Sequence, residues 1–118
     1  VLKKLRQNNF YKKVFFDILF SKKYIYMPTF RKSNVKGKKY AVTYNGKTIN
    51  FGDANMEQYK DTTGLGLYSN KNHLDEKRRK SYLARAMGIK NKNGELTYKL
   101  KTSPNYYSVK YLWSYYKK

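Results

Sequence analysis

The segment 40–51 constrains the fold of this chain more than any other part of its sequence. Two short runs rich in β-branched and aromatic residues, 40–44 and 47–51, flank the dipeptide Asn45-Gly46. Asn-Gly readily adopts the positive φ angles of a type I′ turn, which joins two antiparallel strands through a two-residue loop. Such a turn fixes the register, and the opposed residues are then Tyr44 with Lys47, Val42 with Ile49 and Tyr40 with Phe51. Because these pairs share one face, we predict that this face of the hairpin is buried.

Three later segments are expected to be helical. Asp53 can cap a short helix that runs to about Tyr59, and Asn72 can cap a longer helix that runs to Met87. Ser103-Pro104 is typical of a helix start, and the last helix would extend over about 105–116. The sequence therefore predicts an α+β domain, in which a small sheet containing the hairpin packs against two or three helices.

Residues 1–35 are expected to form a basic N-terminal arm beside a domain of residues 36–118. Pro28 interrupts regular structure, and a basic linker follows it. An amphipathic helix is predicted over about 10–20. It could pack on the chain's own domain, lie on a membrane or dock into another protein, and we favour another protein. The residues expected to anchor this arm are Val14, Phe15, Ile18 and Leu19.

The charge of the chain indicates an anionic partner. There are 27 Lys and Arg against 7 Asp and Glu, a net charge of +20. Such an excess repels itself until nucleic acid phosphates, anionic lipids or acidic protein surfaces balance it, and solubility alone needs less. Most of the cations are lysines, which act as point charges and favour non-specific attraction. The predicted contacts are Lys36, Lys38, Lys39, Lys77, Arg78, Arg79, Lys80 and Arg85. The run 77–80 could instead be a solvated helix face.

Aromatic residues are the second unusual feature, with 14 tyrosines in 118 residues. The last predicted helix would bury one stripe of side chains, and Tyr106, Trp113 and Tyr116 fall outside that stripe. Exposed aromatic side chains can stack on bases or anchor a protein interface, and we favour the interface.

Few side chains of the chain suit catalysis near neutral pH. There is no cysteine, and the single histidine, His73, lies at a predicted helix start, where a solvated or capping role is expected. The acidic residues are scattered, which leaves two-metal nuclease chemistry as the last alternative. We therefore expect a protein that is not an enzyme and that uses no metal, cofactor or small-molecule substrate.

Part of the sequence resembles a known kind of viral domain. The residues 38–53, KKYAVTYNGKTINFGD, and 56–59, MEQY, are similar to a small basic domain of nucleocytoplasmic large DNA viruses and some phages. Residues 78–85 and 103–113 match its second half. The resemblance implies residence in the virion, in the capsid shell or the core. A minor capsid, cement or connector protein that binds other capsid proteins is then expected, with a DNA-binding protein that condenses the genome as the alternative.

Overall fold

The computed structural model describes residues 28–115, which form an antiparallel sheet and a helical layer. The strands lie across the sheet in chain order: β1 (Phe30–Lys32), β2 (Lys38–Tyr44) and β3 (Lys47–Asp53). The helical elements are the 3₁₀ turns η1 (Ser69–Lys71) and η2 (Thr97–Lys99), the helices α2 (Glu76–Ala86) and α3 (Pro104–Tyr107), and the π-helical turn η3 (Ser108–Leu112). The α+β class predicted from the sequence is confirmed.

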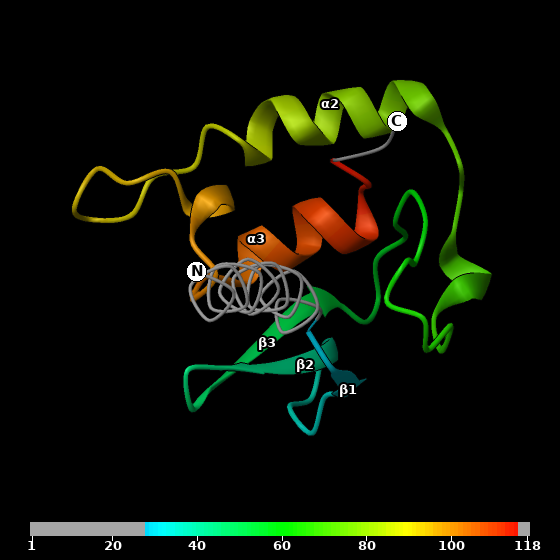
Figure 1. The fold of residues 1–118 in the computed structure, drawn as a ribbon. Coiled ribbons are helices and arrows are strands. Elements are labelled where there is room, and N and C mark those ends of the chain that lie inside the picture. Colours follow the sequence, from blue (N-terminus) through cyan, green and yellow to red (C-terminus); the bar gives the residue numbers. More distant parts are fainter. Residues whose placement is uncertain (1–27, 116–118) are drawn as a thin grey trace, which may run out of the picture.

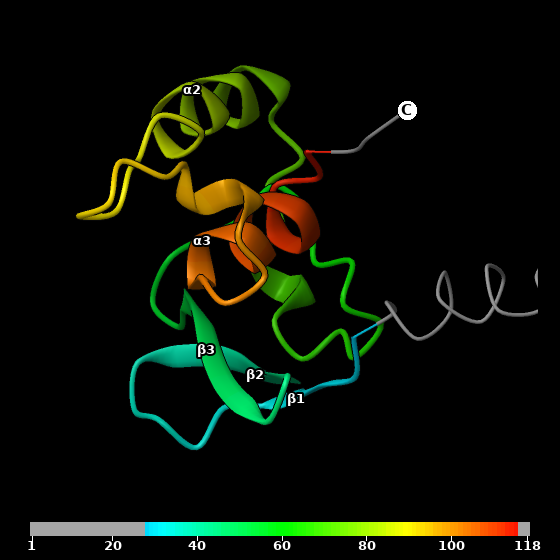
Figure 2. The same cartoon turned by 60° about the vertical axis from the view of Figure 1, so that its left-hand side comes forward.

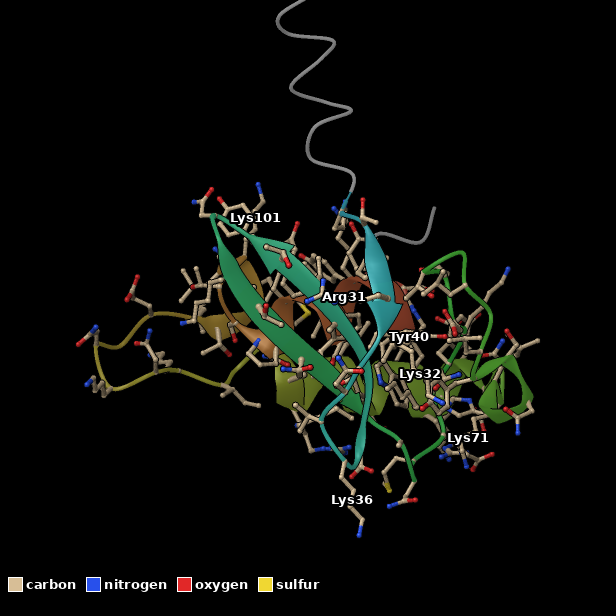
Figure 3. All side chains as sticks on the ribbon, turned by 90° about the horizontal axis from the view of Figure 1, so that it is seen from below. Arg31, Lys32, Lys36, Tyr40, Lys71 and Lys101 are labelled. Atoms are coloured by element: carbon tan, nitrogen blue, oxygen red, sulfur yellow. The ribbon has the colours of Figure 1, made fainter. Side chains whose placement is uncertain are left out.

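These elements are arranged in three tiers, which Figures 1 and 2 show from two directions. The sheet is the lowest tier, α3 and η3 lie above it, and α2 lies above α3. The opposite face of the sheet carries Arg31, which crosses the strands and donates to Thr43 Oγ1 at 3.1 Å (Figure 3). Within the described part of the chain, no helix has the length and apolar character needed to cross a membrane.

The hairpin forms as predicted. Tyr44 lies opposite Lys47, Val42 opposite Ile49 and Tyr40 opposite Phe51. Both turn residues have positive φ, 49° at Asn45 and 75° at Gly46, as a type I′ turn requires. The predicted inner face is buried, and Ile49, the most exposed of its four apolar residues, is only 3% exposed. The turn chemistry and the alternation of side chains therefore predict the same register that the fold uses.

Aromatic rings build the core between the sheet and α3. Phe51 packs on Tyr107 with ring centroids 5.5 Å apart, and Phe30 contacts Phe51 edge-on at 5.6 Å. Phe30 also contacts Tyr111, at 4.7 Å. Edge-on and tilted rings at these distances add attraction beyond their burial of apolar surface. The core thus links the first strand to the last helical segment.

The predicted boundary between residues 35 and 36 is wrong. Strand β1 pairs with β2, with Phe30 opposite Val42 and Lys32 opposite Tyr40. Phe30 is buried, and Ser33 donates from its hydroxyl to Asn50 Oδ1 at 2.6 Å. The domain therefore begins before residue 36. Its first strand, β1, covers the edge of the hairpin that β2 forms. The arm anchors Val14, Phe15, Ile18 and Leu19 lie outside the described residues.

Residues 54–60 form a loop, so the predicted helix from Asp53 to Tyr59 is wrong. The backbone of this loop pairs with a distant segment instead: Gln58 N donates to Lys71 O at 3.1 Å, and His73 N donates to Gln58 O at 3.0 Å. Asn72 is also not the cap of α2, because its side chain accepts from Gln58 and from Asp61 N. Long-range pairing has replaced the local hydrogen bonds that a helix would have used.

The last helix is shorter than predicted. Ser103 caps it, accepting from Asn105 N at 3.3 Å, and Pro104 occupies its first turn, as expected. The helix then widens into η3 and ends at Leu112, and Ser114 follows with a positive φ of 50°. A left-handed residue ends a helix, so the chain turns away before residue 116.

Candidate functional site

A cleft of about 720 Å³ lies between α2, the end of the hairpin and the segment α3–η3. The buried residues Leu112 and Trp113 form part of its inner wall, and exposed side chains form its rim. Five of the eight predicted cationic contacts line it, although they come from two distant parts of the sequence: Lys38, Lys39, Lys77, Arg78 and Arg85. The fold therefore brings most of the predicted anion-binding residues together in one place.

Helix α2 supplies most of the basic rim. It begins after Asp75, whose carboxylate accepts from Lys77 N at 3.0 Å and Arg78 N at 3.2 Å. The buried residues of α2 are Leu83 and Ala86, which are three positions apart and share one face. Arg78 and Arg85 lie seven positions apart, about two helical turns, so both project to one side, about 10 Å apart along the helix axis. The amphipathic pattern thus turns a row of cations toward the cleft.

The rim of the cleft has a positive net charge. Its exposed cations are Lys38, Lys77, Arg78 and Arg85, and its carboxylates are Asp53 and Glu57. Arg78 Nη1 lies 3.2 Å from Glu57 Oε1, and the two side chains are 48% and 55% exposed. An ion pair this exposed stabilises a fold by about 1 kcal/mol at most, so an anionic ligand could displace it at little cost.

The side chain of Arg79 does not lie free on the surface, where the sequence analysis expected a contact for a partner. Its side chain is only 12% exposed and pairs with Glu76 at 2.8 Å. It also donates to Trp113 O at 3.0 Å and to Ser114 O at 2.7 Å. The guanidinium therefore satisfies carbonyl groups at the end of the last helix and ties α2 to it, which is a structural role.

Lys39 is also not a surface contact, although it lines the cleft. The residue is 1% exposed, and its Nζ donates to Met56 O at 2.7 Å and to Gln58 Oε1. Within residues 28–115 it forms no ion pair with a carboxylate. Burial, reinforced by the nearby charge of Lys71, lowers the pKa of Lys39 to about 8. Lys39 thus holds the loop 54–60 against β2 instead of facing solvent.

The predicted interface aromatics are mostly inside the protein. Trp113 is 9% exposed and stacks on Tyr82, with ring centroids 4.0 Å apart and planes 7° apart. Tyr106 is half-buried and packs edge-on against Tyr107 at 4.9 Å. Trp113 is therefore part of the core and not the free anchor that was predicted, because η3 turns it onto α2. Tyr116 lies outside the described residues.

The two remaining cationic contacts lie apart from the cleft. Lys36 and Lys80 are both exposed, and neither lines the cleft. Figure 3 shows Lys36 at the tip of the β1–β2 connection, on the same side of the molecule as Arg31 and Lys32. Lys36, Arg31 and Lys32 therefore leave positive charge on a second surface, which is separate from the cleft.

His73 combines a capping contact with partial burial. Its Nδ1 accepts from Asp75 N at 2.9 Å, in agreement with the predicted capping role, and its ring lies 5.2 Å from that of Trp113. Its Nε2 is buried without a hydrogen-bond partner. Burial and the charge of Arg78 lower the pKa of His73, which favours the neutral ring. Residues 28–115 contain no cluster of three or more potential metal ligands.

Several residues of the cleft have no recognisable signal in the sequence. Gly52 has a φ of 79°, and a Cβ at this position would lie 2.9 Å from Leu112 Cδ1. Met56 and Ile89 also line the cleft, and they are 60% and 51% exposed. The pattern of residues around Gly52 predicts only the end of a hairpin. Isolated apolar residues in loops indicate no particular site.

The comparisons with known proteins give one similarity. Residues 29–63 match the model of a family of unknown function, DUF5754. The matched segment contains β1, β2, β3 and the loop 54–60, so it covers the hairpin wall of the cleft but not α2. No curated protein and no solved structure matches the chain. The chain is thus similar to this family over the sheet and the loop that follows it.

Proposed function

We propose that this chain is a non-catalytic binding protein whose basic cleft holds the phosphate backbone of a nucleic acid without sequence preference. The observation that carries the proposal is the convergence of Lys38, Lys77, Arg78 and Arg85 on one cleft. These cations come from β2 and α2, which the fold has to bring together. The two carboxylates of the cleft leave its net charge positive, and one of them is already paired with Arg78.

Phosphate groups are the anions that best suit this arrangement. Each lysine or arginine that neutralises a phosphate releases a counterion, which makes binding strong at low salt. Lysine and arginine contacts to phosphates position a nucleic acid but carry no sequence information. The net charge of +20 would attract the same partner over longer distances.

The binding of neighbouring capsid proteins, and residence in a virion, stay predictions from the resemblance. One observation favours a protein partner as the second candidate: Leu65, Leu67 and Leu74 are 42%, 53% and 59% exposed and do not line the cleft. Fractionation of disrupted particles would separate the two candidates. A capsid role predicts the protein in the shell fraction, whereas genome binding predicts it in the DNA-containing core.

The salt dependence of oligonucleotide binding tests the proposed function directly. Four phosphate contacts predict that log K falls with log salt with a slope of about −3 for a single strand and somewhat steeper for a duplex. The double variant Lys77→Ala/Arg85→Ala should reduce the size of this slope by about 1.4, because two contacts are lost. Fluorescence anisotropy over a salt series measures both quantities.

The matched control is Lys80→Ala/Lys92→Ala, which removes two exposed lysines outside the cleft. The control should keep nearly the whole slope. Equal losses from the two double variants would mean that net charge alone drives binding and that the cleft is not the site. An affinity that does not change with salt would contradict phosphate binding altogether.

A further inference from the structure

We infer that the cleft takes a single-stranded nucleic acid in preference to a duplex, with bases against its apolar wall and the backbone along its basic rim. This inference rests on the proposed function and adds the form of nucleic acid to it. The cleft has two kinds of surface, and a single strand is the form of nucleic acid that offers a matching apolar and anionic side together.

The apolar part of the cleft is accessible and not only structural. Met56 and Ile89 are two of the exposed large apolar side chains of the described residues, at 60% and 51%, and both line the cleft. They come from the loop 54–60 and from the segment after α2, so the fold places apolar side chains of two separate segments around one space. Apolar side chains left in water gain from a ligand that covers them.

The aromatic side chain of the cleft wall that a base can reach is Tyr82, which is partly exposed, whereas Trp113 is buried and supports it from behind. Tyr82 and Trp113 both line the cleft, and their rings are almost parallel at 4.0 Å. Arg79 bonds to the carbonyl of Trp113, and His73 packs against its ring, so the position of this pair is well determined. Bases stack on aromatic side chains whatever their sequence, which agrees with binding that has no sequence preference.

A duplex matches only the rim. Its bases are paired and stacked inside, and its outer surface presents phosphates and sugars. The volume of about 720 Å³ lies in the range of clefts that hold a ligand of drug size, which suits unstacked bases and not the body of a double helix. A bound duplex would therefore leave Met56 and Ile89 in water.

The test compares a labelled oligothymidylate with a duplex of the same length at one salt concentration. The full chain should bind the single strand more tightly. The variant Met56→Ser/Ile89→Ser should lose about tenfold in affinity for the single strand, as expected when base contacts are removed, and keep its affinity for the duplex. Both side chains are exposed, so the variant should fold, and its urea midpoint checks this.

The control Leu65→Ser/Leu67→Ser changes two exposed apolar residues outside the cleft and should change neither affinity. Equal or tighter binding of the duplex would overturn this inference and leave the proposed function standing, as would equal losses for both ligands in the Met56→Ser/Ile89→Ser variant. Failure to bind either oligonucleotide would refute the proposed function itself. A peptide of alternating Glu and Leu is the competitor for a protein ligand. If it displaces the labelled oligothymidylate at a lower concentration than unlabelled oligothymidylate does, the ligand is a protein and the inference is overturned.

Discussion

Gly52 offers the sharpest test of how the cleft is built. Its φ of 79° disfavours any residue with a Cβ, and a Cβ here would also lie 2.9 Å from Leu112 Cδ1 and 3.2 Å from Lys39 Cβ. Gly46 has almost the same φ, 75°, but nothing lies within 4 Å of its Cβ position. The pair therefore separates the cost of backbone strain from the cost of crowding. Gly52→Ala is the perturbation and Gly46→Ala is the matched control.

The magnitudes follow from these contacts. A left-handed conformation costs an alanine about 1–2 kcal/mol, and the lower entropy of its unfolded chain offsets up to about 1 kcal/mol of that. Gly46→Ala should therefore lower the free energy of unfolding by about 1 kcal/mol. Crowding in a packed core adds about 1–3 kcal/mol. Gly52→Ala should thus lower the free energy of unfolding by about 2–4 kcal/mol.

Urea unfolding followed by tryptophan fluorescence measures both variants. Trp113 is the single tryptophan, and its stacking on Tyr82 makes its emission sensitive to the state of the cleft. With an m value of about 1–3 kcal/mol/M, the midpoint of Gly52→Ala should lie about 1 M below that of Gly46→Ala. Equal midpoints would refute the reasoning, because they would mean that Leu112 and Lys39 do not crowd this position.

Two other predictions concern the buried cations. The pKa of Lys39 is lowered to about 8 in the folded chain, while the ordinary value of 10.5 applies in the unfolded chain. Above pH 8 the unfolded state therefore binds more protons than the folded state. The free energy of unfolding should thus rise by about 2 kcal/mol between pH 7 and pH 9.5. Urea melts across this range should show that rise in the native chain and not in Lys39→Met; the same rise in both would contradict it. Arg79→Ala should lower the free energy of unfolding by about 2–3 kcal/mol, because the partly buried carbonyls of Trp113 and Ser114 lose a charged donor. Lys80→Ala, at the exposed neighbouring position, should change it by less than about 0.5 kcal/mol. Thermal melts that rank the two variants equally would show that the Arg79 contacts contribute nothing.

The cleft could be predicted only in part, and its neighbouring residues show why. Lys38 and Lys39 are identical side chains at adjacent positions, yet Lys38 is exposed on the rim and Lys39 is buried under the loop 54–60. Arg78 and Arg79 differ in the same way, since Arg78 faces the cleft and Arg79 bonds to the end of the last helix. Composition and local pattern treat the members of each pair alike. Contacts with distant segments distinguish them.

The sequence by itself determined the local structures, whose conformation depends on residues that are adjacent in the chain. The Asn45-Gly46 turn, the hairpin register and the Ser103-Pro104 helix start rely on backbone preferences within a few positions, and all three form as predicted. Only the tertiary structure decided the rest. The loop 54–60 pairs with residues 71–74, and β1 pairs with β2. Met56 and Ile89 line the same cleft for the same kind of reason. Each of these contacts joins groups that are far apart in sequence. Such groups come together only when the core of Tyr40, Phe51 and Tyr107 forms, so no local pattern in the sequence predicts them.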